Sequence, residues 1–337
     1  MTQDRKYPGM DRRDFIAAGS TLAAASLLPA SVWAGIEDVP VSPYGFDTTA
    51  DDVARGIDLI GKTALVTGCN SGLGYESMRV MAAQGAHVIG AARTYEKAET
   101  ACNSVEGRTT PVVCELTDFE SIVACADEVN GMDEPLDILM CNAGIMALRK
   151  LEQVNGIEKQ FVVNHLGHYI LTRRLLGLVE AAPAGRIVIL SSIGYQNAPK
   201  EGIQFDNLSG ENGYKPFTAY GQTKLANALF SLELARRYGG TNLTSNSVHP
   251  GLVATNLGRH ITGKPRDPNE PLRKGFKTAD QGAATQVYVA IDPKLAGVSG
   301  YYFEDCNPVD PTGPHMHDYA LAAKLWTVSE EMTADYL

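Results

Sequence analysis

A regular alternation of short apolar runs and helix-length segments constrains the fold of this chain more than any other feature. The runs are rich in β-branched residues, and each is followed by a segment long enough for a helix. Apolar strands separated by helices form a parallel sheet that is covered on both faces. Right-handed crossovers then predict one α/β domain with a doubly wound parallel sheet. The expected strands are 63–67, 87–91, 111–114, 137–140, 186–190, 242–248 and 300–303, and the expected helices are 73–84, 95–105, 119–130, 152–180 and 218–238.

The first 34 residues have the composition of a targeting signal. Arg12 and Arg13 precede a charge-free apolar stretch, residues 17–28, and small residues follow it. A basic region, a short apolar region and small residues at a cleavage position are typical of a secretory signal. The arginine pair resembles the twin-arginine signal, which is used to export folded proteins. The apolar stretch is shorter than the roughly 20 residues that a transmembrane helix needs.

These features divide the chain into three parts. We expect residues 1–34 to be a twin-arginine-type signal peptide, residues 35–57 an N-terminal arm, and residues 58–337 the α/β domain. The expected location is the periplasm, with no stable membrane span once the signal is removed. The alternative is a cytoplasmic protein that keeps its N-terminal segment.

Charge and cysteine usage exclude several classes of function. The chain of 337 residues has 39 acidic and 29 basic side chains, which gives a net charge of -10. Nucleic acid or an anionic membrane would need a basic face, so nucleic acid is not an expected partner. The six cysteines include no CxxC pair and no grouping with histidine at metal-ligand spacing. No metal site is expected, and the cysteines are interpreted as small buried side chains.

A glycine-rich loop directly follows the first expected strand and leads into a helix. Glycines permit the tight turn and let backbone amides approach a pyrophosphate at the positive N-terminus of the helix. This setting predicts a Rossmann-like dinucleotide-binding fold. The loop residues expected to bind the cofactor are Gly68, Asn70, Ser71, Gly72, Leu73 and Gly74.

The end of the second expected strand indicates which dinucleotide is bound. An acidic residue at this position would hold the adenosine ribose hydroxyls of NAD. Ala92 stands there instead, and Arg93 follows it. Because a guanidinium suits the 2′-phosphate of NADP, we expect NADP, with NAD as the alternative. The other interpretation of Arg93 is an ordinary solvated arginine.

Three side chains predict the chemistry. Tyr220 and Lys224 lie four residues apart, on one face of an expected helix. A free tyrosine, with a pKa of about 10, is a poor acid/base at neutral pH. A neighbouring ammonium would lower the tyrosine pKa, and the same lysine can hold the nicotinamide ribose. Ser192 closes the fifth strand, where its hydroxyl can hydrogen-bond a substrate carbonyl.

These motifs occur in the order of a short-chain dehydrogenase/reductase, and the chain resembles that family over about residues 58–305. The run TGCNSGLG has the family's TGxxxGxG spacing, and YGQTK has its tyrosine–lysine pair. FVVNHLGHYILT and SVHPGLVATNL are most similar to the retinol dehydrogenase and WW-domain oxidoreductase branch. The roles that the resemblance implies are proton donor or acceptor for Tyr220, carbonyl polariser for Ser192, ribose binder for Lys224 and water holder for Asn164.

The resemblance also implies further cofactor contacts. Val253 and Thr255 would contact the nicotinamide carboxamide, and Glu115 stands where an aspartate usually meets the adenine. Cys141 replaces the first asparagine of the family's NNAG run, and the 193–219 insert is longer than the commonest spacing. The cofactor residues that rest on the resemblance are Glu115, Leu116, Asn142, Ala143, Gly144, Pro250, Gly251, Val253 and Thr255.

The predicted activity is that of an NAD(P)-dependent alcohol dehydrogenase or carbonyl reductase that acts on a hydrophobic small molecule. The alternative is a catalytically silent NAD(P)-binding sensor or scaffold on the same fold. The resemblance also allows a homo-oligomer. Loops 193–217 and 256–277 would form the substrate pocket, with Phe205, Tyr214, Phe217 and Phe276 among their aromatic residues.

Overall fold

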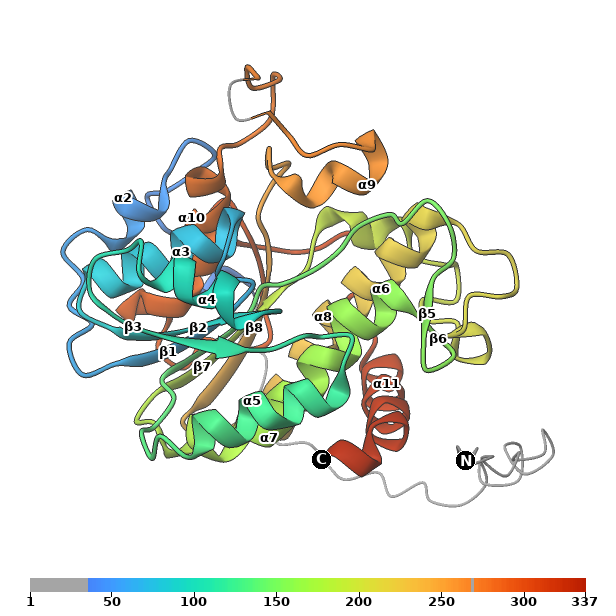
Figure 1. The fold of residues 1–337 in the computed structure, drawn as a ribbon, viewed down its shortest axis with the longest axis horizontal. Coiled ribbons are helices and arrows are strands. Elements are labelled where there is room, and N and C mark those ends of the chain that lie inside the picture. The colour runs from blue at the N-terminus through green and yellow to red at the C-terminus, as the bar shows by residue number, and fades with distance from the viewer. Residues whose placement is uncertain (1–35, 268–269) are drawn as a thin grey trace. The chain divides into compact units, whose positions relative to one another are not determined.

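Eight strands form one sheet at the centre of the molecule, which confirms the expected α/β fold (Figure 1). The computed structural model describes residues 36–267 and 270–337. The strand order is β10-β9-β8-β7-β4-β1-β2-β3, and every neighbouring pair is parallel except β9 and β10. The strands of this sheet are β1 (Thr63–Thr67), β2 (His87–Ala92), β3 (Arg108–Val113), β4 (Ile138–Cys141), β7 (Gly185–Leu190), β8 (Leu243–His249), β9 (Tyr302–Glu304) and β10 (Asn307–Val309).

The direction in which the sheet grows reverses between β1 and β4. From β1 the sheet continues through β2 and β3 on one side, and from β4 through β7, β8 and β9 on the other. In doubly wound sheets, the ligand crevice lies at the carboxyl ends of the strands at this point. The expected glycine loop, the residues after β4 and Ser192 all follow strands that end at this edge.

Helices cover both faces of the sheet (Figure 1). Successive strand residues point to opposite faces, so Leu65 joins the core under α5, α7 and α8, whereas Ala64 and Val66 join the core under α2, α3, α4 and α10. The helices α10 and α11 lie in segments for which no helix was expected. The helices are α2 (Ala50–Ala54), α3 (Gly72–Ala83), α4 (Tyr95–Cys102), α5 (Phe119–Asn130), α6 (Lys159–Phe161), α7 (Gly167–Ala181), α8 (Pro216–Arg237), α9 (Arg259–Thr262), α10 (Ala279–Ile291) and α11 (Tyr319–Met332).

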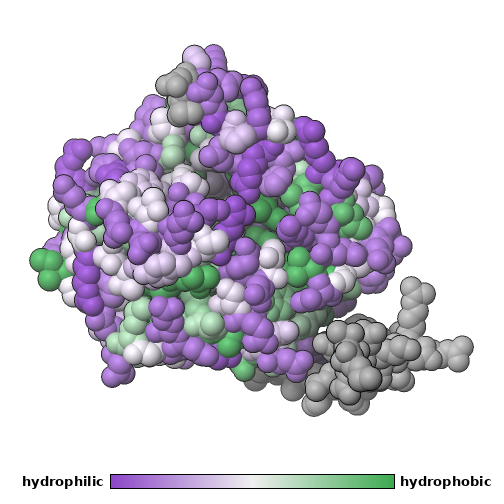
Figure 2. All heavy atoms as spheres, viewed as in Figure 1, coloured by the Kyte–Doolittle hydropathy of each residue, from purple (hydrophilic) through white to green (hydrophobic). Residues whose placement is uncertain are grey.

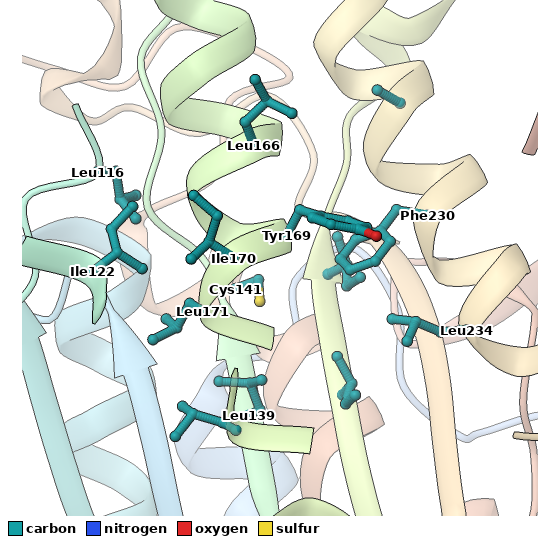
Figure 3. Packing of buried hydrophobic residues seen from close by; sticks show 14 of the residues in the cluster. Leu116, Ile122, Leu139, Cys141, Leu166, Tyr169, Ile170, Leu171, Phe230 and Leu234 are labelled. Atoms are coloured by element: carbon teal, nitrogen blue, oxygen red, sulfur yellow. The ribbon is translucent and has the colours of Figure 1, made fainter. Parts of the chain in front are cut away.

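Aromatic side chains join α7, α8 and α11 over the first of these cores. Figure 3 shows the rings of Tyr169 and Phe230 side by side. The rings of Tyr169 and Phe230 are 5.3 Å apart, and Trp326 of α11 packs edge-on against Tyr169 at 5.3 Å. Leu139 and Cys141 of β4 belong to the same core. The helix that carries Tyr220 and Lys224 is therefore held between the sheet and α11.

The segment 152–180 differs from the single helix that its length suggests. It begins with the short hairpin of β5 (Gln153–Val154) and β6 (Ile157–Glu158). Asn155 and Gly156 form its turn, with φ angles of 53° and 77°, and an Asn-Gly pair strongly favours such turns. A π-helical turn then separates α6 from α7. The expectation of one continuous helix is wrong because the turn signal outweighs the apolar pattern around it.

Residues 36–57, expected as an N-terminal arm, pack onto the domain. Val39 and Val53 are buried in the core beside α10. The backbone amide of Ala50 donates to Asp280 Oδ1 at 3.0 Å. The expected signal peptide, residues 1–34, lies outside the described residues. In the part of the chain that the structure describes, no helix is both long and apolar enough to cross a membrane.

Candidate active site

Hydrogen bonds join the ends of β1 and β4. The hydroxyl of Thr67 accepts from the backbone amides of Asn142 at 2.9 Å and Ala143 at 3.0 Å. The Asn142 side chain donates back to the Thr67 carbonyl at 2.8 Å. The structure therefore brings the glycine loop and the expected run Asn142–Gly144 side by side at the switch point of the sheet.

The glycine loop forms a cradle that has no room for side chains. Gly68 and Gly72 have φ angles of 71° and 58°, where glycine is favoured. A Cβ atom on Gly74 would collide with the Gly68 carbonyl oxygen and lie 2.5 Å from Asn142 Nδ2. Ser71 precedes α3 without capping it through its side chain, so the first amides of α3 can bind an anion. The cradle fits a dinucleotide pyrophosphate.

Tyr220 and Ser192 meet at the carboxyl end of β7. Tyr220 is only 6% exposed on α8, and its ring and the Ser192 Oγ both lie within 3.3 Å of the position that a Cβ on Gly194 would take. Ser192 lies two residues beyond the end of β7, where its Oγ also accepts from the amide of Gly194 at 3.0 Å. A Cβ on Gly194 would lie 2.8 Å from the Tyr220 ring, so the turn and the ring are in close contact.

Lys224 is fully enclosed one helical turn after Tyr220. It is 3% exposed, and its Nζ donates to the carbonyl of Leu190, the last residue of β7, at 2.9 Å. Asn227 Nδ2 donates to the same carbonyl at 3.0 Å. Sequence reasoning missed Asn227, although its position three residues after Lys224 places both side chains on one face of α8.

Asn164 connects the loop after β4 to α8. It lies in the π-helical turn Val162–Leu166, a feature that often marks functional sites. Its side chain accepts from the amide of Ile145 at 2.8 Å and donates to the Ile145 carbonyl at 2.9 Å and to Thr223 Oγ1 at 3.0 Å. A Cβ on Gly144 would lie 3.2 Å from Asn164 Oδ1 and 4.0 Å from Lys224 Nζ. The expected residues Gly144, Asn164 and Lys224 therefore converge.

Burial dominates the pKa values of the tyrosine and the lysine. It raises the pKa of Tyr220 to about 12, although the neighbouring Ser192 hydroxyl acts to lower it. Burial also lowers the pKa of Lys224 to about 7. The expectation that the lysine lowers the tyrosine pKa is therefore wrong for the chain without cofactor. Lys224 Nζ lies over the Tyr220 ring, 5.6 Å from its centroid, and donates to a carbonyl instead of to the phenol oxygen.

The low pKa of Lys224 links the stability of the chain to pH. Between about pH 7 and the ordinary lysine value of 10.5, the unfolded chain binds a proton at this site that the folded chain does not. The contribution of Lys224 to the free energy of unfolding therefore rises as the pH rises through this window. We expect the melting temperature of Lys224→Met, relative to wild type, to fall between about pH 7 and about pH 10. Thermal unfolding of both proteins without cofactor measures this, and a difference that does not change with pH would contradict it.

The segment after β8 reaches the glycine loop. The methyl carbon of Thr255 lies 3.4 Å from the position that a Cβ on Gly72 would take. Val253 packs against α10, where a Cβ on Gly282 would lie 2.6 Å from its side chain. Gly251, which follows Pro250, has a φ of 87°. The expected cofactor residues 250–255 thus lie between the start of α3 and α10.

Three expected adenine-side residues lie at the ends of β2 and β3. Arg93 is exposed directly after β2. The carboxylate of Glu115 accepts from the amide and the hydroxyl of Thr117, at 3.0 and 2.9 Å. Leu116 is buried, and a Cβ on Gly167 would lie 3.1 Å from it. Arg93 is thus available to an anionic ligand, whereas the Glu115 carboxylate already has partners.

His168 is a buried residue that supports Asn164 from α7. Its Nε2 lies 2.9 Å from Thr67 Oγ1, and its Nδ1 lies 3.2 Å from the Asn164 carbonyl oxygen. Burial lowers its pKa to about 4, so the ring is neutral at pH 7. The ring connects the π-helical turn to the end of β1. The signal in the sequence is its place one helical turn after Asn164.

The cysteines are packing residues, as the sequence indicates. All six are free thiols and buried. Cys141, at the position of the family's asparagine, lies with its Sγ 3.6 Å from Thr172 Oγ1. Across residues 36–267 and 270–337, no group of three His, Cys, Asp or Glu side chains is arranged to hold a metal ion.

Comparison with known proteins identifies close relatives over most of the chain. The family model described as short chain dehydrogenase matches residues 62–265. Short-chain dehydrogenase TIC 32 B, chloroplastic, of Brassica napus is 40% identical over 300 residues, which cover 86% of this chain and 93% of the relative. Retinol dehydrogenase 14 of Homo sapiens is 40% identical over 294 residues, covering 81% and 86%. WW domain-containing oxidoreductase of Homo sapiens is 34% identical over 319 residues, covering 90% and 76%.

A solved structure agrees with these relatives. The crystal structure of an uncharacterized protein from Mycobacterium Paratuberculosis has a TM-score of 0.67 and 32% sequence identity. The match covers 83% of this chain and 97% of the other. The fold is therefore shared over nearly the whole of that protein.

The expectation of a periplasmic location is wrong. The relatives described above are a chloroplastic dehydrogenase and human dehydrogenases and oxidoreductases, and none of these names is that of a periplasmic protein. The segment that suggested export lies outside the described residues, so its geometry gives the expectation no support.

The alternative of a silent sensor or scaffold is not favoured. The relatives are dehydrogenases and an oxidoreductase, and the tyrosine, lysine, serine and asparagine expected for turnover all meet at one edge of the sheet. A cradle for a pyrophosphate lies beside them. The chain belongs to the short-chain dehydrogenase/reductase family and is an NAD(P)-dependent oxidoreductase that acts on a small molecule.

Proposed function

We propose that the chain interconverts a hydrophobic alcohol and its carbonyl compound, with NADP as the cofactor. The observation that carries this proposal is the buried Tyr220 ring beside the Ser192 hydroxyl, both against Gly194, with Lys224 one helical turn away. The nicotinamide, when bound, supplies or accepts the hydride. In the direction of reduction the substrate carbon gains the hydride and the substrate oxygen gains a proton.

Tyr220 moves the proton in this proposal. Its Oη donates to the carbonyl oxygen during reduction and accepts from the alcohol during oxidation. With a pKa of about 12, Tyr220 carries its proton at neutral pH, which is the state that reduction requires. The Ser192 hydroxyl stabilises the negative charge that develops on the substrate oxygen. Lys224 binds the nicotinamide ribose, and Asn164 holds a water beside the lysine.

The cofactor contacts in this proposal follow the cradle and the neighbouring loops. The first amides of α3 bind the pyrophosphate, because the positive end of the helix dipole favours an anion there. The residues proposed as contacts are Gly68, Asn70, Ser71, Gly72, Leu73, Gly74, Arg93, Glu115, Leu116, Asn142, Ala143, Gly144, Pro250, Gly251, Val253 and Thr255, together with Tyr220 and Lys224.

Arg93 supports NADP over NAD. β2 ends in Ala92, so no carboxylate on that residue repels a 2′-phosphate, and the Arg93 guanidinium is exposed. We expect Arg93→Asp to weaken NADP binding by more than about tenfold, because a charge-assisted contact becomes a repulsion. Titration with the reduced cofactors NADPH and NADH, whose dihydronicotinamide rings fluoresce, measures both affinities. NAD affinity should change little, and Arg55→Asp, an exposed charge reversal on another surface, is the matched control. A wild-type chain that binds NAD more tightly than NADP would contradict this choice.

Apolar side chains near the crevice support a hydrophobic substrate. Ile193, Phe217, Leu252 and Ile261 are exposed although they are large and apolar. Figure 2 shows hydrophobic residues around the hollow at the centre of the face, below the segment that contains α9.

Two of the aromatic residues expected in the pocket contact other parts of the chain. The Phe205 ring lies under Lys324 of α11, and the Tyr214 hydroxyl donates to the Leu148 carbonyl at 2.7 Å.

A substrate screen tests the proposal. The purified chain is incubated with NADPH and aldehydes or ketones of increasing apolar size, and with NADP and the matching alcohols. Oxidation of NADPH should depend on the carbonyl compound, and KM should fall as apolar area is added, because each buried CH₂ contributes about 0.8 kcal/mol. Tight cofactor binding without turnover of any compound would reject the proposed reaction.

A further inference from the structure

Lys277 is a buried lysine outside the groups used so far. It is 1% exposed, just before α10. Its Nζ lies 2.5 Å from Asp305 Oδ1 and 5.0 Å from the centroid of the Phe46 ring. Lysine is almost never fully buried unless it is paired. Taking the ammonium out of water is costly, so this position needs a reason beyond stability.

The same residue holds the segment 250–255 in place. The amide of Lys277 donates to the Leu252 carbonyl at 2.8 Å, and its carbonyl accepts from the amide of Ala254 at 3.0 Å. The aliphatic stem of Lys277 lies against Gly251, where a Cβ would be 3.0 Å from Lys277 Cδ. The main chain of Lys277 therefore holds the residues on both sides of Val253, and its side chain packs against Gly251.

Asp305 is a firm anchor for the ammonium group. It lies in the tight turn between β9 and β10, where Asp305 and Cys306 have φ angles of 49° and 60°. The amide of Cys306 donates to Thr285 Oγ1 of α10 at 3.1 Å. The Asn307 side chain donates to the Asp305 carbonyl at 2.9 Å and to the Tyr44 carbonyl at 3.0 Å. The turn is thus fixed by the sheet, by α10 and by the N-terminal segment.

We propose that Lys277, through its pairing with Asp305, is a positioning residue that sets the orientation of the nicotinamide. The inference rests on the proposed contact of Val253 and Thr255 with that ring. Lys277 acts through the 250–255 segment and does not touch the cofactor itself. The ion pair, whose lysine end is buried, ties the segment to the β9–β10 turn, so it fixes where the segment lies. The distance between the reacting carbons depends on that placement.

Lys277→Met tests the proposal because it keeps the apolar stem and removes the charge. Asp305 keeps 35% of its side chain exposed, so an unpaired carboxylate there stays hydrated and the fold should persist. We expect NADP binding to weaken by about tenfold, as when a group that orients a ligand is removed. The NADP fragment without nicotinamide, 2′-phospho-ADP-ribose, should bind within about twofold of wild type. With a substrate from the screen, kcat should fall by about 10²-fold, with a smaller change in substrate KM.

The matched control is Lys62→Met. Lys62 Nζ pairs with Asp137 Oδ1 at 2.8 Å at the opposite end of the sheet. The Lys62→Met variant should change thermal stability, but any change in its affinity for NADP should equal the change in its affinity for the fragment. If Lys277→Met does not fold, the double variant Lys277→Met/Asp305→Asn removes both charges and takes its place. It should fold and still lose affinity for NADP selectively.

Two outcomes overturn the inference. One is an equal loss of affinity for NADP and for the fragment, which would make the role of Lys277 merely structural. The other is wild-type NADP affinity in a folded Lys277→Met chain or in the double variant. If the wild-type chain prefers NAD, the same comparison is made with NAD and ADP-ribose. A failed substrate screen would reject the proposed reaction and leave the binding comparison to decide this inference.

Discussion

Tyr220→Phe is expected to reduce kcat by at least about 10²-fold, the usual scale for a lost general acid/base. The substitution removes one oxygen from a ring that is 6% exposed and otherwise packed, so the fold should persist. Cofactor affinity should stay near the wild-type value, because Lys224 and the glycine cradle are unchanged. Steady-state turnover and fluorescence titration of NADPH together separate the two effects.

Tyr195→Phe is the matched control for this substitution. Tyr195 lies three residues after Ser192, but its hydroxyl donates to the Thr312 carbonyl at 2.8 Å, away from the reacting groups. It should lose a hydrogen bond worth about 1 kcal/mol of stability and keep its turnover. Near-wild-type activity in Tyr220→Phe would remove Tyr220 from the mechanism and require another proton donor.

Gly74→Ala is expected to weaken binding of the dinucleotide by about 10²-fold. Overpacking costs about 1–3 kcal/mol, and the upper end of that range corresponds to a change of about this size in the dissociation constant. The added methyl group would meet the Gly68 carbonyl and the Asn142 amide, and the backbone carbonyl cannot move without opening the cradle. Affinity for 2′-phospho-ADP-ribose should fall as much as affinity for NADP, because both carry the pyrophosphate. Calorimetric titration of both ligands measures this.

Gly177→Ala provides the comparison for Gly74→Ala. Both glycines lie in helices, but a Cβ on Gly177 would have no neighbour within 4 Å. That variant should gain up to about 1 kcal/mol of stability from helix propensity and bind the cofactor normally. Equal cofactor affinities in the two variants would show that the cradle tolerates a side chain.

The sequence was sufficient to predict every strand of the main sheet except β10, and the position of the glycine loop. β1 and α5 have the predicted bounds, because runs such as TALVT are buried on both faces of a parallel sheet and have no other stable environment. Tyr220, Lys224 and Asn164 were found because their spacing on a helix, or their motif, is local in sequence. Local patterns of this kind are visible without knowledge of tertiary packing.

Other features depend on contacts between distant segments. Leu190 has no functional side chain, yet its carbonyl accepts from Lys224 and Asn227. The raised pKa of Tyr220 follows from burial, which spacing on a helix does not report. Lys277 and Asp305 look like ordinary surface charges in the sequence, and only the path of the chain buries the lysine and pairs it with Asp305.

The packing of α11 has a consequence for the order in which the protein is made. The guanidinium carbons of Arg173 and Arg237 lie 5.0 and 4.2 Å from the centroid of the Trp326 ring, and Trp326 also packs on Tyr169 and Phe230. A ribosome releases α7 and α8 well before α11, so these aromatic rings stay uncovered for part of synthesis. Exposed apolar surface of this kind is what chaperones bind in nascent chains. The helix that carries the reacting tyrosine thus reaches its final packing late, and premature termination before α11 would leave a chain recognisable to quality control.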